Sequence, residues 1–276
     1  MHRIVLVLLR EVEYAKPASV AEALALLAAN DGARALAGGQ TLISVMKARA
    51  ASPDALIDLN GLDELKGIEL AGDGTLTIGA MTTYAEIVAS AEAKARPILA
   101  EVCATIADVQ VRNRGTIGGN LCSNDPTNHL PPLMVATGAR MTILGAGGER
   151  EVPAADFFLG VYLTAVGPGE LLTKITIPAG KGDGFAAVTL GTDGTCIVNA
   201  AASVSDGAVR VALGCVDAIP VLVEPASAEA DAVAEAVRAA NLMPPSDVHA
   251  SSEYRIHLAE VLAARAAAEA AERAGG

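Results

Sequence analysis

The sequence predicts a mixed α/β fold of the α+β class, with an interior built from small aliphatic side chains. Apolar residues make up 52% of the 276 residues, whereas aromatic residues make up only 3%, which favours a core of alanine, valine and leucine. Segments with the two-residue alternation of strands and segments with the spacing of helices follow one another along the chain. We therefore expect three units, at residues 1–58, 59–178 and 179–276, in a chain long enough for two or three compact cores.

The first unit is expected to be α/β. Ser19 and Glu22 form a capping box, which predicts a helix that extends through Ala29, and residues 56–59 alternate as a strand does. The apolar residues 4–9 are too short to cross a membrane and lack a cleavage-site pattern. They are expected to form a first strand or an unstructured leader.

The second unit is expected to combine helices with strands that become antiparallel from Met141 onward. Thr83 and Glu86 form another capping box, and residues 94–107 have the composition of a further helix. A hairpin turn is expected at the glycine-rich residues 145–148. Strand-like alternation marks three segments: residues 75–78, 141–144 and 150–152.

The third unit is expected to contain a hairpin and two alanine-rich helices. An Asp-Gly turn joins the strand-like residues 199–204 to residues 209–213. The helices are expected at residues 226–239 and 253–271, with a loop between them at residues 241–247.

Two glycine-centred segments are the strongest functional signal in the sequence. Residues 37–41 (AGGQT) lead into a helix-like run at residues 42–51, and residues 116–120 (TIGGN) follow the apolar, strand-like residues 106–111. Such turns present backbone N–H groups to an anion, and glycine permits close approach and positive φ. One pair of glycines alone is more often a structural turn, but the two segments together are expected to form two halves of a diphosphate cradle.

Charge and motif spacing narrow the kind of ligand. The net charge of −12 argues against a nucleic-acid or anionic-membrane surface, so a diphosphate would be bound by local N–H groups, with Arg112 and Arg114 beside the second segment. Neither segment has the G-x-G-x-x-G order of a Rossmann loop with its acidic residue, and no G-x-x-x-x-G-K-[ST] loop occurs.

The sequence shows no catalytic or metal-binding constellation. The four cysteines lie far apart and the histidines lack ligand spacing, which argues against a disulfide framework and against a zinc or iron–sulfur site made by this chain alone. Cys122 is expected to be a small buried residue. Because no nucleophile-elbow order of serine, histidine and aspartate is present, the chemistry is expected to belong to a cofactor.

Six separated motifs occur in the order of one known family. They lie at residues 37–49, 56–60, 77–82, 109–120, 156–160 and 252–258. In these motifs the chain resembles the FAD-binding medium subunit of the molybdenum hydroxylases, the family of xanthine and carbon monoxide dehydrogenases, from about Tyr14 to the C-terminal helix. The resemblance implies a two-part FAD-binding domain of the vanillyl-alcohol-oxidase (PCMH) type, followed by a C-terminal α+β domain.

The resemblance also implies a cofactor site. The two glycine segments would hold the FAD diphosphate through N–H groups and the hydroxyls of Thr41 and Thr116, while Ile106 and Leu172 would pack on the flavin. Asp125 is expected either to accept a bond from a ribose hydroxyl or the adenine side, or to form an Asx turn before proline. The expected cofactor-binding residues are Leu36, Ala37, Gly38, Gly39, Gln40, Thr41, Leu42, Ile43, Ile106, Thr116, Ile117, Gly118, Gly119, Asn120, Asp125 and Leu172.

Two residues depart from the family pattern. His129 stands where relatives commonly have an aspartate near the ribose or adenine, and Thr189 stands where a lysine is common. Residues 190–196 also lack the basic and aromatic residues often found beside the isoalloxazine. Because a nearby cation favours the reduced, anionic flavin, its loss is expected to lower the flavin potential.

The function implied by the resemblance is electron transfer. A large molybdopterin subunit would oxidise the substrate, a small subunit with two 2Fe–2S clusters would relay electrons, and the FAD of this chain would pass them to a quinone, NAD or oxygen. The assembly is expected to be a cytoplasmic dimer of heterotrimers. Two alternatives stay open, a stand-alone FAD-dependent oxidoreductase of the same fold and a non-catalytic assembly scaffold.

Overall fold

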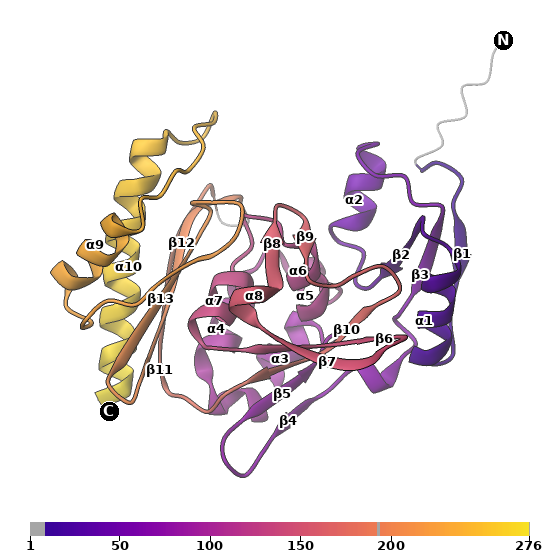
Figure 1. Cartoon of the computed structure of the whole chain (residues 1–276), viewed down its shortest axis with the longest axis horizontal. Helices are drawn as coiled ribbons and strands as arrows, with labels where there is room; N and C mark the ends of the chain where they lie inside the picture. The colour runs from indigo at the N-terminus through magenta and orange to yellow at the C-terminus, as the bar shows by residue number, and fades with distance from the viewer. Residues whose placement is uncertain (1–8, 192–193, 276) are drawn as a thin grey trace.

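The computed structural model describes residues 9–191 and 194–275. Three sheets follow one another along the long axis of the molecule (Figure 1), a three-stranded sheet at the N-terminal end, a five-stranded sheet in the middle and a four-stranded sheet at the C-terminal end. This arrangement confirms the mixed α+β fold. The strand or leader expected at residues 4–9 falls almost wholly outside the described residues.

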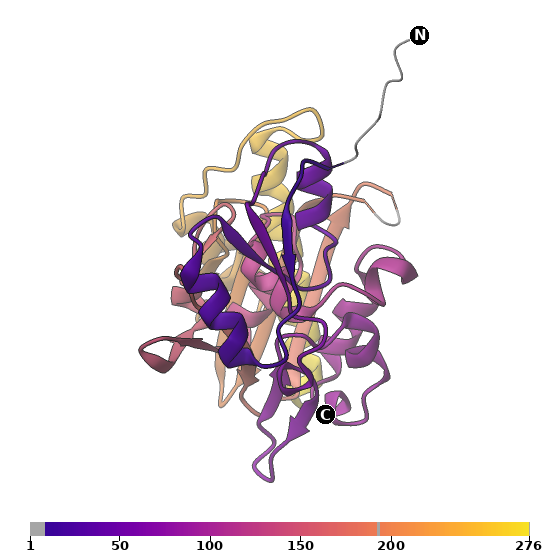
Figure 2. The same ribbon diagram turned by 90° about the vertical axis from the view of Figure 1, so that its right-hand side faces the viewer.

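The N-terminal sheet is parallel, with the order β1-β3-β2. Figure 2 looks onto this end of the molecule, where the sheet lies in front of the other two. Because neighbouring parallel strands end at the same edge, the segments that follow β2 and β3 lie side by side. The elements are β1 (Glu13–Ala15), α1 (Val20–Ala29), β2 (Ala33–Leu36), α2 (Leu42–Lys47) and β3 (Ala55–Asp58).

The helices of this unit begin where the sequence predicts. The Ser19 hydroxyl accepts a hydrogen bond from the Glu22 N–H at 3.2 Å, so α1 is capped as expected. α2 is shorter than the helix-like run at residues 42–51, because it ends at Lys47 and Arg49 takes a positive φ of 63°.

The middle sheet is antiparallel, with the order β4-β5-β10-β6-β7. The glycine-rich residues 145–148 make the β6–β7 hairpin turn, as expected. Thr83 and Glu86 form the expected capping box.

The strands are β4 (Ile68–Leu70), β5 (Leu76–Gly79), β6 (Arg140–Gly145), β7 (Gly148–Pro153) and β10 (Leu171–Ile177), and the short hairpin is β8 (Phe158–Gly160) with β9 (Leu163–Thr164). The helices are α3 (Tyr84–Ala89), α4 (Pro97–Thr105), α5 (Val109–Arg112), α6 (Ile117–Ser123), α7 (Leu130–Ala136) and α8 (Ala154–Phe157), with 3-10 turns η1 (Asp63–Leu65) and η2 (Glu92–Ala95).

Two expectations for this unit are wrong in detail. The helix expected at residues 94–107 is divided into η2 and α4, because Pro97 opens α4 and the residue before a proline disfavours helical φ and ψ. The strand-like residues 106–111 instead contain the start of helix α5. The Asp108 carboxylate accepts from the Val111 N–H at 2.8 Å and so caps this helix, which overrides the β-branched composition.

The C-terminal sheet has the order β11-β12-β13-β14, and α10 packs against β11 and β12 (Figure 1). The expected Asp-Gly hairpin is present, with positive φ at both Asp206 and Gly207. A β-carbon on Gly184 would lie 2.1 Å from the Ala266 carbonyl oxygen, so glycine lets α10 approach the sheet closely. The elements are β11 (Gly182–Thr189), β12 (Cys196–Ser205), β13 (Ala208–Gly214), β14 (Val221–Val223), α9 (Ala230–Ala239) and α10 (Ser252–Gly275).

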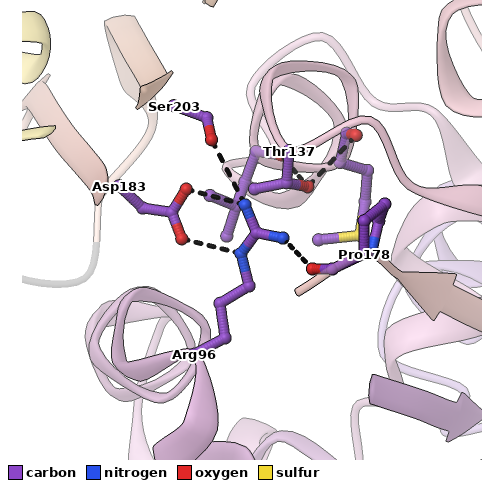
Figure 3. Close-up of polar contacts among 7 residues, drawn as sticks. Arg96, Thr137, Pro178, Asp183 and Ser203 are labelled. Carbon is purple, nitrogen blue, oxygen red and sulfur yellow. Dashed lines mark hydrogen bonds and ion pairs between the residues drawn. The ribbon is translucent and has the colours of Figure 1, made fainter. Parts of the chain in front are cut away.

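The middle and C-terminal parts share a core and a buried ion pair. Ala201 and Ala212, which are paired across β12 and β13, pack into the core of the middle part. The guanidinium of Arg96 donates to both carboxylate oxygens of Asp183, at 2.7 and 2.8 Å, and to Ser203 at 3.2 Å (Figure 3). The limits between units at residues 58 and 178 stay predictions, since the shared core crosses the second of them.

Candidate cofactor site

The first glycine segment leaves the end of β2 and turns into α2. Gly39 has a φ of 73°, a conformation that other residues adopt only with strain. Within the described residues, the N–H groups of Gly39, Gln40 and Thr41 donate no hydrogen bond. Gln40 and Thr41 are exposed, so this segment presents the free donors that an anion requires.

A polar support behind β3 fixes the position of this segment. Asn60 donates from Nδ2 to the Ala37 carbonyl at 2.9 Å and to Asp58 Oδ1 at 2.6 Å. The Tyr14 hydroxyl donates to Asp58 Oδ2 at 2.5 Å. Burial favours a raised pKa for Asp58, but the hydrogen bonds from Tyr14 and Asn60 outweigh it and lower that pKa. Sequence reasoning missed this support, although Asp-x-Asn directly after a strand was a signal for it.

The second glycine segment is the first turn of helix α6, with Thr116 as N-cap. The Thr116 hydroxyl accepts from the Gly119 N–H at 3.1 Å. The Ile117 N–H donates to the Thr82 carbonyl at 3.0 Å, and the Gly118 N–H donates to a carbonyl of the same 80–82 turn. The N–H groups of residues 117–120 are therefore engaged within the chain, which contradicts the expectation that they are free for an anion.

The two segments are in contact through their backbones. A β-carbon on Gly38 would lie 2.0 Å from the carbonyl oxygen of Arg114, which directly precedes the second segment. A β-carbon on Gly119 would lie 3.5 Å from Ala37 and 2.9 Å from the Thr116 hydroxyl. The structure thus brings the two segments together, and the glycines are required mainly for this close packing.

Two arginines and one unpaired hydrogen-bond acceptor lie beside the glycine segments. Arg112 is engaged, since its guanidinium donates to the carbonyls of Ile106 and Ala107 at 3.0 and 2.6 Å. Arg114 is exposed, and its side chain makes no hydrogen bond or ion pair within the described part of the chain. The Oδ1 atom of Asn120 is buried and accepts no hydrogen bond there. A buried acceptor without a donor lowers the stability of the fold. Asn120 Oδ1 therefore suits a ligand that carries hydroxyl or amine groups.

The outer residues of the expected site lie on separate elements. Leu172 is a buried residue of β10. The carbonyl of the next residue, Thr173, accepts a hydrogen bond from the Ala80 N–H at 2.9 Å. Ala80 in turn lies against Gly118 of the second glycine segment. Ile106 is the C-cap residue of α4 and is partly buried. The Oδ1 atom of Asp125 accepts from the Thr127 N–H at 3.0 Å, which is the Asx turn considered above.

Asp125 also has a second partner and lies at the far end of α6. The Tyr162 hydroxyl donates to Asp125 Oδ2 at 3.1 Å. Asp125 follows the seven-residue helix α6, whose length is about 10 Å. It therefore lies away from the diphosphate end of the site, and its contact with a ribose stays a prediction. Cys122, on the same helix, is half-buried and packs against the core.

The two departures from the family pattern occupy different surroundings. His129 lies with Nδ1 3.1 Å from Asn199 Nδ2, and its ring packs edge-on against Phe185. Thr189 ends β11, where its hydroxyl donates to the Gly191 carbonyl at 3.1 Å. Neither side chain supplies an anion or a fixed cation.

The residues present fit a dinucleotide cofactor. The free N–H groups of residues 39–41 and the unpaired Arg114 side chain suit a diphosphate. The glycine segments contain no acid or base, since residues 36–43 and 116–120 carry no titratable side chain. Among the described residues, no cluster of histidine, cysteine and acidic side chains could hold a metal ion, and no helix is long and apolar enough to cross a membrane.

Comparison with known proteins gives consistent matches. Residues 10–180 match the family model of the FAD binding domain in molybdopterin dehydrogenase. The chain is 40% identical to the carbon monoxide dehydrogenase medium chain of Afipia carboxidovorans, over 95% of this chain and 97% of that one. It is 36% identical to the nicotine 6-hydroxylase medium subunit of Paenarthrobacter nicotinovorans, over 95% and 98%. The solved structure of reconstituted CO dehydrogenase from Oligotropha carboxidovorans superposes with a TM-score of 0.90 at 36% identity, over 97% of this chain and 100% of that chain.

Proposed function

Because this chain belongs to the family of FAD binding domains in molybdopterin dehydrogenases, we propose that it is the electron-exit subunit of a molybdenum-dependent hydroxylase or dehydrogenase. In this proposal it accepts electrons from the 2Fe–2S clusters of a small partner subunit. It passes them to an external acceptor, a quinone, NAD or oxygen. Substrate oxidation belongs to a molybdopterin cofactor on a large partner subunit. Family membership itself identifies an oxidoreductase subunit with the PCMH-type FAD-binding fold expected from the sequence.

The observation that carries the proposal is the contact between the two glycine segments. The free N–H groups at residues 39–41 and the Arg114 guanidinium are assigned to the diphosphate. Asn120 Oδ1 is assigned to a hydroxyl or amine of the cofactor. Thr41, Thr116 and the remaining expected residues line the same cradle in this assignment, with Leu172 and Ile106 on the flavin side and Asp125 toward the ribose.

Bound FAD supplies the electron-transfer chemistry, and the residues of this chain position it. No acid or base lies within the glycine segments, so the site is suited to pass electrons and not to abstract protons from an organic substrate. The Asn60 and Asp58 hydrogen bonds hold the first segment in place.

The partner subunits are inferred from the relatives. One relative is named a medium chain and another a medium subunit, which indicates assemblies with further chains. We assign this chain to a dimer of heterotrimers with a small 2Fe–2S subunit and a large molybdopterin subunit. The four free cysteines suit a reducing compartment, so we place the assembly in the cytoplasm.

Expression of the chain alone tests the proposal. The purified protein should be yellow, and its flavin should be reduced by dithionite and reoxidised by a quinone, a dye or oxygen. It should oxidise no organic substrate or carbon monoxide until the two partner subunits are added. Substrate turnover by the isolated chain at the rate of the complex would identify a stand-alone oxidoreductase, and a colourless protein that takes up no FAD would identify a scaffold.

A further inference from the structure

Two cysteines from different strands meet beneath the loop that follows α6. Cys196 begins β12 and Cys215 directly follows β13, and both are at least nine-tenths buried. Asn199 lies between them, with Nδ2 3.4 Å from the Cys196 sulfur and 3.9 Å from the Cys215 sulfur. The Cys196 thiol donates to the Val188 carbonyl at 3.7 Å. Two thiols 19 residues apart in the sequence are therefore neighbours in the fold.

The backbone and the hydrogen bonds of this pair are under strain. Cys215 has a φ of 66°, in the left-handed region that residues other than glycine seldom adopt. The Asn199 amide nitrogen, which has two hydrogens, also faces the Asn128 carbonyl at 3.2 Å and His129 Nδ1 at 3.1 Å. Asn199 Oδ1 is buried and unpartnered within the described residues. Strained backbone of this kind clusters at functional sites.

The two sulfurs differ in acidity. The neighbouring Cys215 thiol lowers the pKa of Cys196 against the opposing effect of burial, and His129 lowers it further. The neighbouring Cys196 sulfur and burial raise the pKa of Cys215. A thiolate held beside a thiol is the arrangement that reactive dithiols use. By contrast, burial raises the pKa of Cys103 and of Cys122, the latter to about 12.

A small pocket reaches Cys215, one member of the pair. Cys215 lines it together with Asp125 and Pro126. The Cys215 thiol donates to the Pro126 carbonyl at 3.1 Å. Through this bond, and through Asn199, the cysteine pair is connected to residues 126–129.

We propose that Cys196 and Cys215 form a reversible dithiol–disulfide site that responds to peroxide and releases the loop at residues 126–129. In this reaction a sulfur–sulfur bond forms and the oxygen–oxygen bond of hydrogen peroxide breaks. The two sulfurs together lose two electrons and two protons, and the peroxide leaves as two water molecules. A dithiol reductant reverses the reaction by thiol–disulfide exchange.

Release of the loop follows from the loss of the thiol hydrogen. The disulfide form of Cys215 has no proton to donate to the Pro126 carbonyl, so that carbonyl loses its bond to the C-terminal sheet. Movement of the two sulfurs toward each other also changes the surroundings of the Asn199 amide, which holds Asn128. Oxidation of the pair therefore loosens a segment that adjoins α6.

Mass spectrometry of the native protein treated with stoichiometric hydrogen peroxide tests the site. We expect a cross-linked peptide pair containing Cys196 and Cys215, reversed by dithiothreitol, with Cys103 and Cys122 still alkylated as free thiols. The peptide that contains residues 124–130 should exchange its amide hydrogens about 3-fold faster or more in the oxidised protein. A protein that keeps four free thiols, or that links another pair, overturns the proposal, as does a cross-link without faster exchange at residues 124–130.

Matched variants separate the pair from general oxidation. In Cys215→Ser the cross-link should be absent, and Cys196 should be labelled by dimedone as a sulfenic acid. Cys103→Ser should form the same cross-link as the unmodified chain. Because the wild-type measurement needs no variant, it decides the question even where Cys215→Ser fails to fold. Equal dimedone labelling of Cys103 and Cys196 would overturn the special reactivity of the pair.

Discussion

The carbonyl oxygen of Arg114 occupies the position where a side chain on Gly38 would have to begin, 2.0 Å from the ideal β-carbon. Gly38 belongs to the N-terminal unit and Arg114 to the middle part, so the contact joins the two halves of the candidate cofactor site. It involves backbone atoms only. The spacing between the two halves is thereby set by the chain itself, without an adjustable side chain.

Gly38→Ala should lose FAD and stability together. The added methyl group overlaps a backbone atom that cannot rotate away, which we expect to cost about 1–3 kcal/mol or more. The flavin-to-protein absorbance ratio and the melting temperature measure the two effects. Gly147→Ala is the control, because Gly147 lies in the β6–β7 turn with no atom within 4 Å of its β-carbon. Full flavin content in Gly38→Ala would show that the contact does not shape the site.

Asn60→Ala should weaken FAD binding while the fold is kept. It removes one hydrogen bond to the Ala37 carbonyl, worth about 1 kcal/mol, so the dissociation constant should rise about 5-fold. Asn60→Asp should weaken binding at least as much, since a carboxylate oxygen would face the same carbonyl. Calorimetric titration of apoprotein with FAD gives both constants. Unchanged affinity in both variants would exclude a role for this support.

Asp58 should make a pH-dependent contribution to stability. Its folded pKa is lowered, so its stabilising effect is fully present above the unfolded pKa of about 3.9 and is lost as the pH falls through the folded pKa. The difference in unfolding free energy between wild type and Asp58→Asn should therefore be largest near neutral pH and shrink in acid. Urea titrations at several pH values measure this difference. A difference that is constant down to the acid limit would contradict the assignment.

Arg96→Met should be strongly destabilising, because it leaves the Asp183 carboxylate buried without its partner (Figure 3). We expect a loss of about 3–5 kcal/mol. The double variant Arg96→Met with Asp183→Leu should recover much of this loss, since no charge is then left unpaired. Arg140→Met, which breaks an exposed pair with Glu151, should cost less than about 1 kcal/mol. Equal losses in the single and double variants would argue against an ion-pair origin.

Thr189→Lys should raise the flavin potential if residue 189 faces the isoalloxazine, as the family pattern implies. A cation there favours the reduced, anionic flavin. Thr189→Gln is the matched control, because it adds length without charge. A redox titration of the three proteins decides the point, and a potential in Thr189→Lys that is equal to or below that of the control would contradict it.

Local signals in the sequence predicted much of this fold. The capping residues Ser19 and Thr83 and the Asp-Gly turn at residues 206–207 are correct because each depends on neighbours within four residues. The strand-like interpretation of residues 106–111 is wrong for an equally local reason. The Asp108 carboxylate caps helix α5 and so favours helix over strand.

The parts that sequence could not predict depend on distant pairings. Arg96 and Asp183 are 87 residues apart, and no local pattern indicates that they meet. The satisfied N–H groups of Ile117 and Gly118 likewise depend on carbonyls that precede them by 35 and 38 residues in the chain. The glycine motif identified two segments that meet in the fold, but only the tertiary contact shows that one of them offers donors and the other offers close packing.

Because the proposed FAD site is divided between two units, the stability of the folded chain should depend on the supply of FAD. Because FAD contacts both glycine segments in our assignment, it binds only when both units are folded and in contact, and binding stabilises the folded chain by an amount that grows with the free FAD concentration. Chains that lack the cofactor spend more time open and are degraded faster. We therefore expect the half-life of this chain in flavin-limited cells to be shorter than in flavin-replete cells, a difference that pulse-chase labelling measures and that Gly38→Ala should abolish.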